Sequence, residues 1–505
     1  MRARIRLDEV SLAPYVGHPP AHPSPDAERS RPPARTAPIP PRRGWTRPGG
    51  GRAAVVPPVP VYRGSTAQVQ GLYPWLHGGS LPAAGAYIGV DCLTGGSVSC
   101  HPLAWLAAGL TSNPNLVVTG LPGAGKSATI KALALRLMPY GIRSFVVGDL
   151  KNEYAPLARA VGTRPIELGP GLPGRLNPLD AGPLGESLPA GQVALSERLT
   201  EIHRRRLVLL CSLAAMRLGR ALSPTEEQAM SLAILEASGR TAQRPEGGGA
   251  GSLRGGALEA SPTIPQVWAL MRDPTAAMAR ELRVRDDSVT VLREMTRPVT
   301  DALGGMVRGA LAGLFDGPTT VSPDFAAPIQ TVDLSRMADR TDEVIAMILS
   351  CVSSWAQAAI DAPGPARMIV RDELWRSLSV PALVRKIDSD LRLSRAQGTI
   401  QVLATHRLSD FEAAGPAGSP EAAIASNLIA SCDTRVCLRQ DTAPLAQTRE
   451  QVGLTDVECA HIASWSGHHV GRAVWKIGRT ASAVVQLVLT PAEQQLFYTN
   501  ERMVF

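Results

Sequence analysis

Apolar and polar positions alternate in two different ways along the chain. In two regions, short apolar runs alternate with stretches of helical periodicity, which is typical of a parallel sheet covered by helices. The predicted strands are 115–119, 143–147, 330–334, 368–370, 399–404, 435–438, 473–477 and 483–489. The predicted helices among them are 127–138, 154–161, 342–360, 374–396 with a break at Pro381, and 422–429. The pattern therefore predicts an α/β fold.

The segment between these two regions has helical periodicity only. A helix is predicted over 198–218, and Ser223-Pro224-Thr225-Glu226 is a capping box with proline at the first helical position. A glycine-rich loop follows at 240–262, and further helices are predicted between 264 and 314. We interpret 185–325 as an all-α insertion into one α/β domain, whose two parts are 84–184 and 326–505.

The first 60 residues have a different composition. They hold 14 of the 43 prolines and no lysine, and such a segment buries too little apolar area to offset the entropy of ordering it. We predict a disordered Pro/Arg-rich tail over 1–60 and a linker over 61–83. The tail is either an electrostatic arm for nucleic acid or anionic lipid, or a solvated extension without a partner.

Charge and cysteine usage narrow the class of protein. The formal net charge is +8, yet residues 1–52 contribute ten arginines and four acidic residues, so the other 453 residues carry 42 basic and 40 acidic groups. Aromatic residues make up only 4%, which argues against a base-stacking nucleic-acid module. Seven cysteines without a C-x-x-C pair indicate reduced thiols and a cytoplasmic chain, and no apolar run approaches the ~20 residues of a membrane helix.

A phosphate-binding loop follows the strand predicted at 115–119. Gly120-Leu121-Pro122-Gly123-Ala124-Gly125-Lys126-Ser127 matches G-x-x-x-x-G-K-S, in which glycines let backbone N–H groups cradle phosphates. Lys126 is expected to reach the β- and γ-phosphates of ATP, and the Ser127 hydroxyl to ligate Mg²⁺. The candidate nucleotide-binding residues are Gly120, Pro122, Gly123, Ala124, Gly125, Lys126, Ser127 and Ala128.

A pair of carboxylates follows a second apolar strand. Asp372 and Glu373 end the run Arg367–Arg371, and an ATPase needs one carboxylate for Mg²⁺ and one to orient or deprotonate water. We assign Asp372 to the metal and Glu373 to the general base. Because central parallel strands are apolar on both faces, Arg371 must either emerge at the strand end or find a buried partner.

Three further sites carry candidate polar residues. His406 follows the strand at 399–404, where a sensor of the γ-phosphate would lie, although a solvated loop histidine fits the same position. Arg435 is the candidate for an arginine that acts on a neighbouring subunit's nucleotide, with a surface salt bridge as the alternative. Arg204-Arg205-Arg206 lies in a predicted helix and is either a solvated face or a DNA contact.

These motifs resemble the HerA–FtsK superfamily, and within it the TraC-like ATPases of type IV secretion and conjugation, especially those of actinobacterial elements. The resemblance covers about 84–505. It is carried by the phosphate loop and by these segments: Gly89-Val90-Asp91, Thr94-Gly95, Asp149-Leu150-Lys151-Asn152-Glu153-Tyr154, Asn177-Pro178-Leu179-Asp180, Phe315-Asp316-Gly317-Pro318-Thr319, Asp372-Glu373-Leu374-Trp375, Leu489-Thr490-Pro491 and Glu493.

The resemblance implies a RecA-like, ATP-driven hexameric motor with Mg²⁺ as cofactor, and it places Asp372 and Glu373 in the metal and base roles. The partners that it implies are further copies of the chain, other secretion or conjugation subunits and, as a candidate, DNA. It also implies a peripheral position at the cytoplasmic face of the membrane, held through partners. His406 stands where the family usually has glutamine, Asn152 where it has glycine, and Arg371 where it has an apolar residue. Two alternatives stay open: an FtsK- or HerA-like double-stranded DNA translocase, and an ATP-binding structural subunit with slow turnover.

Overall fold

The computed structural model describes residues 84–186, 188–239, 253–254, 257–258, 261–309, 311–361, 364–378, 380–414, 419–479 and 481–498. The tail predicted over 1–60 and the linker over 61–83 lie outside these ranges. Within them, no helix is both long and apolar enough to cross a membrane.

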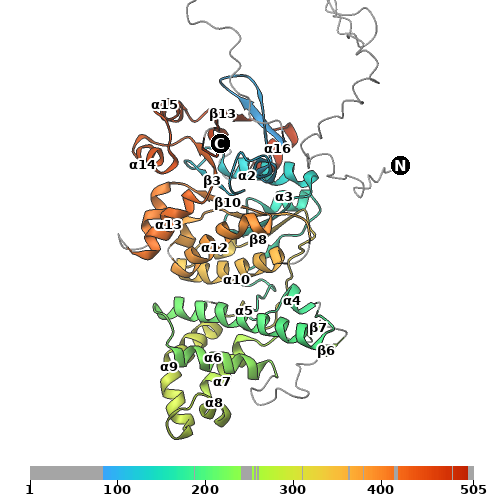
Figure 1. Ribbon diagram of the computed structural model, residues 1–505, viewed down its shortest axis with the longest axis vertical. Helices are drawn as coiled ribbons and strands as arrows, with labels where there is room; N and C mark the ends of the chain where they lie inside the picture. Colours follow the sequence, from blue (N-terminus) through green and yellow to red (C-terminus); the bar gives the residue numbers. More distant parts are fainter. Residues whose placement is uncertain are drawn as a thin grey trace, which may run out of the picture. The chain divides into compact units, whose positions relative to one another are not determined.

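One eleven-stranded sheet organises the part of the chain that the structure describes (Figure 1), in the order β2-β1-β13-β12-β11-β3-β10-β9-β4-β8-β5. Neighbouring strands from β11 to β5 run parallel, and those from β2 to β11 run antiparallel. The strands are β1 (Ala86–Asp91), β2 (Ser97–Cys100), β3 (Leu116–Thr119), β4 (Arg143–Asp149), β5 (Ile166–Glu167), β8 (Ile329–Asp333), β9 (Arg367–Arg371), β10 (Thr399–Thr405), β11 (Thr434–Leu438), β12 (Arg472–Ile477) and β13 (Ala481–Leu487). The predicted α/β fold class is confirmed.

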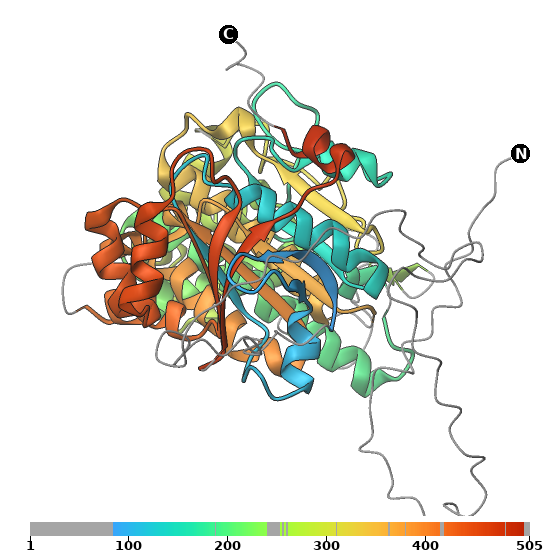
Figure 2. The ribbon, with the colours of Figure 1, turned by 90° about the horizontal axis from the view of Figure 1, so that it is seen from above.

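Helices cover both faces of this sheet because its central strands are apolar on both sides. Leu116 and Val118 of β3 pack in one core with α2, whereas Val117 between them packs in another with α12 and α13. Figure 2 shows the blue hairpin β1–β2 beside the red strands that extend the sheet. The helices outside the helical segment are α1 (Pro102–Ala107), α2 (Lys126–Leu137), α3 (Ala155–Ala160), α10 (Asp342–Asp361), α11 (Trp375–Leu378), α12 (Pro381–Gln397), α13 (Pro420–Ala430), α14 (Thr442–Val452), α15 (Asp456–Ser464) and α16 (Pro491–Phe497).

The residues described between β5 and β8 form helices, one short hairpin and the turns that connect them. Its helices are α4 (Pro183–Glu186), α5 (Gln192–Leu218), α6 (Pro224–Ala237), α7 (Ile264–Arg272), α8 (Ala276–Glu281) and α9 (Val289–Arg308). Helix α6 begins with the predicted capping box, in which Ser223 and Glu226 each accept the other's backbone N–H. Most of the loop predicted over 240–262 lies outside the described residues, and the prediction is wrong where β6 (Leu253–Arg254) pairs with β7 (Ala257–Leu258). Helix α5 shares its hydrophobic core with α10.

Arg371, at the end of β9, has a buried partner, which is the second of its two predicted outcomes. Its side chain is buried, and Nη2 donates to Oδ2 of Asp390 on α12 at 2.6 Å. Nη1 donates to Oε1 of Gln401 on β10, and the Asp390 carboxylate also accepts from Lys386. The guanidinium therefore ties the last residue of β9 to the neighbouring strand and to the helix that covers it.

We expect Asp390→Ala to lower the free energy of unfolding by about 3–5 kcal/mol, because it leaves the Arg371 guanidinium buried without its carboxylate. Chemical denaturation followed by circular dichroism measures this loss. The matched control is Asp388→Ala on the same helix, which removes an ion pair to the exposed Arg392 and should cost less than about 1 kcal/mol. Equal losses in the two variants would contradict a structural role for the buried pair.

Candidate functional site

The phosphate loop connects the end of β3 to the start of α2. Gly120 to Gly125 form the turn, and Lys126, Ser127 and Ala128 open the helix. Gly125 has φ +105°, and a Cβ there would meet the Gly471 backbone nitrogen at 2.7 Å. Only glycine fits this left-handed, closely approached position. The loop is braced from behind, since Gly471 N–H donates to Ala124 O and Leu121 N–H to Arg439 O, both at 2.9 Å.

Lys126 is buried and folds back over the loop. Its Nζ donates to the carbonyl oxygens of Gly120 at 2.8 Å and Leu121 at 3.2 Å, and it lies 2.9 Å from Nδ1 of His406. Burial lowers the pKa of Lys126 to about 8, although the charges of Asp372 and Glu373 partly oppose this. The ammonium is thus placed among acceptors that a phosphate would replace.

Asp372 and Glu373 follow β9 at the edge of the sheet that also carries the phosphate loop. The strands β3, β10 and β9 are parallel neighbours, so their carboxyl ends lie at one edge. Asp372 Oδ2 accepts from the Tyr154 hydroxyl at 2.8 Å, and burial raises the pKa of its carboxyl. Glu373 has φ +51°, a left-handed conformation that non-glycine residues rarely adopt. This strain directs two successive carboxylates into one site.

Three donors hold the Glu373 carboxylate. Oε1 accepts from Lys151, and Oε2 accepts from Trp375 Nε1 at 2.7 Å and lies 3.2 Å from His406 Nε2. Burial acts to raise the pKa of Glu373, but the hydrogen bonds from His406, Lys151 and Trp375 outweigh it and keep the pKa well below its usual range. The carboxylate is therefore ionised and firmly oriented.

His406 connects the phosphate loop to this carboxylate. An ammonium can only donate, so Nδ1 accepts from Lys126 and Nε2 carries the proton that points to Glu373. The histidine lies just beyond the end of β10, between the ends of β3 and β9, as the sheet order requires. Lys126, His406 and Glu373 thus form a continuous chain across three strand ends.

Sequence reasoning did not assign roles to Lys151 and Tyr154, which lie on the turn after β4. Asp149 organises this turn by accepting the backbone N–H groups of Glu153 at 2.9 Å and Tyr154 at 2.7 Å. Asn152 has φ +56°, the left-handed conformation that asparagine tolerates better than most residues. The departure from glycine at this position is therefore compatible with the turn. The adjacency of β4 and β9, which no local pattern encodes, brings the turn to the carboxylates.

The remaining candidate, Arg435, lies within β11 rather than at its carboxyl end. It is paired in register with Val117 of β3 and Lys476 of β12. Among the residues that the structure describes, its buried Nε has no hydrogen-bond partner. Arg439, just past the strand end, is the arginine whose backbone contacts the phosphate loop of the same chain.

The residues that would hold Mg²⁺ are the Ser127 hydroxyl at the start of α2 and the Asp372 carboxylate at the end of β9. Both supply oxygen, the donor that Mg²⁺ prefers, and both lie at the carboxyl edge of the parallel strands. A magnesium ion that bridges phosphates needs only one or two such protein ligands. The donor set therefore fits the cofactor.

Comparisons with known proteins place the fold. No protein-family model and no curated protein sequence matches the chain. Among solved structures, VirB4 of Thermoanaerobacter pseudethanolicus aligns with a TM-score of 0.63 and 21% identity, over 82% of this chain and 99% of that one. The conjugative coupling protein TrwB in its unbound form aligns with a TM-score of 0.46 and 14% identity, over 74% of this chain and 85% of that one. TrwB in complex with ADP and Mg²⁺ aligns with a TM-score of 0.45 and 13% identity, over 76% of this chain and 88% of that one. The VirB4 likeness shows that the two chains share a fold.

Proposed function

We propose that this protein is a Mg²⁺-dependent ATPase whose turnover drives conjugative DNA transfer or type IV secretion. The observation that carries the proposal is the chain of contacts from Lys126 through His406 to Glu373, with Asp372 beside it. A fold shared with VirB4 over nearly the whole of that chain supports the secretion role.

The site residues divide the work of phosphoryl transfer. The loop N–H groups and Lys126 would bind the β- and γ-phosphates, so Lys126 exchanges its bonds to the Gly120 and Leu121 carbonyls for bonds to phosphate oxygens. Ser127 and Asp372 would hold Mg²⁺, which neutralises charge on the phosphates when bound. Glu373 would orient the attacking water and accept its proton.

His406 would report the state of the γ-phosphate to Glu373. When Lys126 turns to a phosphate, Nδ1 of His406 loses its donor, and a turn of the ring would let its N–H donate a hydrogen bond to a phosphate oxygen. Its contact with Glu373 then changes as well. A glutamine could bridge the two groups in the same manner, since it also offers one acceptor and one donor group.

Assembly is part of the proposal. We propose that copies of the chain form a ring, with a hexamer as the expected state, and that Arg435 faces the nucleotide of a neighbouring copy. Other secretion or conjugation subunits, and DNA, would be its partners in the cytoplasm or at the inner face of the membrane. Measurement of the mass of the purified protein with and without ATP tests the self-association.

A second candidate function is an ATP-binding structural subunit with slow turnover. The three donors on Glu373 favour it, because a carboxylate so strongly stabilised as an anion is a weak base. Phosphate release and nucleotide binding by the purified protein distinguish the two. Tight ATP binding with no turnover above that of a Lys126→Ala variant would support the structural subunit and contradict the motor.

Lys151→Met tests how strongly the contact with Lys151 stabilises the ionised Glu373 carboxylate. Lys151 lowers the pKa of this carboxyl, so its removal raises that pKa, and the carboxylate is then protonated at a higher pH. Because that pKa lies well below its usual range, protonation of Glu373 does not limit turnover near neutral pH, and we expect the less stabilised, more basic carboxylate to raise kcat at pH 7 by about threefold. Lys476→Met, which removes an ion pair to Glu458 away from the site, is the control and should leave kcat unchanged.

A further inference from the structure

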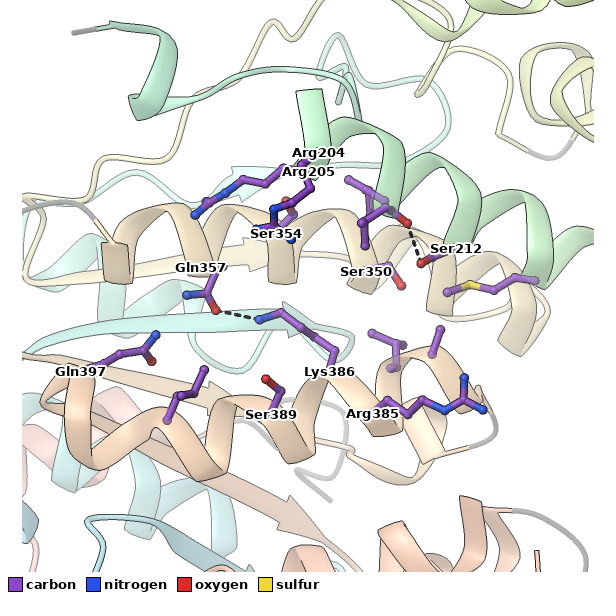
Figure 3. A pocket seen from close by; sticks show the side chains of 16 residues that line it. Arg204, Arg205, Ser212, Ser350, Ser354, Gln357, Arg385, Lys386, Ser389 and Gln397 are labelled. Carbon is purple, nitrogen blue, oxygen red and sulfur yellow. Dashed lines mark hydrogen bonds between the residues drawn. The ribbon is translucent and has the colours of Figure 1, made fainter. Parts of the chain in front are cut away.

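A second concave site lies between the helical segment and the sheet. Figure 3 shows α5 above it, with α10 and α12 forming its other sides. The cavity measures about 660 Å³, which falls within the ~300–1,000 Å³ typical of small-molecule sites. We call it the α5–α12 groove, and its lining residues used below are Arg204, Arg205, Val208, Leu209, Ser354, Gln357, Arg385, Lys386, Ser389 and Leu393.

The α5–α12 groove has a strong bias in charge. Arg204 and Arg205 reach it from α5, and Arg385 and Lys386 from α12, while none of the sixteen described residues that line it is a carboxylate. The nearby Glu201 carboxylate is shared between Arg204 and Arg205. Asp390, which accepts from Lys386, also faces the buried Arg371. The groove therefore presents positive potential to whatever enters it.

Apolar side chains line the groove from two sides. Val208, which is 55% exposed, and the half-buried Leu209 come from α5, and Leu393, which is 48% exposed, comes from α12. The hydroxyls of Ser354 on α10 and Ser389 on α12 also line it. A ligand that satisfies all of these groups carries negative charge on one part and a flat or apolar body on another.

The groove is joined to the catalytic carboxylates by a continuous set of contacts. Gln357 Oε1 accepts from Lys386 at 2.7 Å, and Lys386 donates to Asp390. Asp390 binds Arg371, which directly precedes Asp372. An anion that draws Lys386 away from Asp390 would alter the electrostatic environment of the residue next to the metal-binding carboxylate.

We propose that the α5–α12 groove binds a soluble organic phosphate of nucleotide size, and that its occupancy modulates the catalytic site through Lys386, Asp390 and Arg371. The phosphate pairs with the cations of α5 and α12, and the organic body packs on Val208 and Leu393. The Arg-rich first 52 residues of this chain are excluded as occupant by their own positive charge.

Binding is tested on the full-length protein with the fluorescent N-methylanthraniloyl derivative of AMP, in the presence of Mg²⁺ and of ADP at a concentration just sufficient to fill the phosphate loop. AMP lacks the β- and γ-phosphates that the phosphate loop would hold, and ADP occupies that loop. We expect saturable binding, and Arg385→Glu should raise the Kd at least about tenfold. Arg392→Glu reverses the same charge on α12 but outside the groove lining, and should leave the Kd unchanged.

Ser389→Trp provides a second variant, since it fills the groove from an exposed position without a change of charge. It too should weaken binding, and thermal melting checks that it folds. Absent binding, or equal binding by all variants, would overturn the site. Competition by anionic phospholipid vesicles, with no binding of the AMP probe, would assign the groove to a lipid and also overturn the proposal.

The link to the catalytic site has its own readout and rests on the proposed ATPase. We expect saturating AMP to change the rate of ATP hydrolysis at least about twofold, and this change to be lost in Arg385→Glu. If AMP binds but the rate of ATP hydrolysis does not change, the proposed link to the catalytic site is overturned, whereas the binding site in the groove stands. A protein without ATPase activity that still binds the probe would contradict the proposed function alone.

Discussion

Replacement of Glu373 by glutamine should leave ATP binding intact and lower turnover by about 10²–10⁴-fold. Glutamine keeps the size of the side chain and one acceptor oxygen for the donors around it, but it cannot take a proton from water. Lys151 is half exposed and can turn to solvent, so the loss of one acceptor should cost little stability. Phosphate release under steady-state conditions measures the rate, and a fluorescent ATP analogue measures the affinity.

Glu167→Gln is the matched control for this substitution. Glu167 forms an exposed ion pair with Arg159 at 3.4 Å, outside the site, so the same change of charge there should leave turnover unaltered. Retained turnover in Glu373→Gln would refute the base role of Glu373 and would mean that another group accepts the proton.

Replacement of Lys126 by alanine should lower ATP turnover at least about 100-fold, because the variant loses the cation placed to stabilise charge on the γ-phosphate. It also removes the donor to His406 Nδ1, and so breaks the contact between the loop and Glu373. Single-turnover measurements at saturating ATP separate this loss of chemistry from weaker binding.

Two further variants make the Lys126 result specific. Lys476→Ala removes a lysine that pairs with Glu458 away from the loop, and should keep full activity. Lys126→Arg keeps the charge but not the compact ammonium that fits between the Gly120 and Leu121 carbonyls, so activity should stay low. Equal turnover in wild type and Lys126→Ala would contradict the proposed ATPase.

The local sequence pattern was sufficient to predict the elements that carry the candidate site residues. The phosphate loop, β9 and the carboxylates after it were predicted, because apolar runs and G-x-x-x-x-G-K-S are encoded in neighbouring residues. The contacts of Lys151, Tyr154 and Trp375 were not predicted, because they depend on which strands lie side by side. The buried partner of Arg371 was expected as a class, but its identity as Asp390 follows only from the packing of α12 on the sheet.

Some elements were missed although a signal for them was present. Helices α15 and α16 each begin with a capping box, Thr455 with Glu458 and Thr490 with Glu493, and the structure contains both boxes. The hairpin β1–β2 was not predicted, and its place at the sheet edge is set by the pairing of β1 with β13. Short elements of this kind are decided by tertiary contacts rather than by periodicity.

The brace of Gly471 and Arg439 behind the phosphate loop has a consequence for synthesis on the ribosome. The loop is translated early, but the backbone groups that fix Ala124 and Leu121 emerge some 350 and 320 residues later. At about 5–20 residues per second, the nascent chain therefore carries an unsupported loop for roughly 20–70 s. A nascent chain of this protein should acquire nucleotide affinity only when the segment that contains Gly471 has left the exit tunnel.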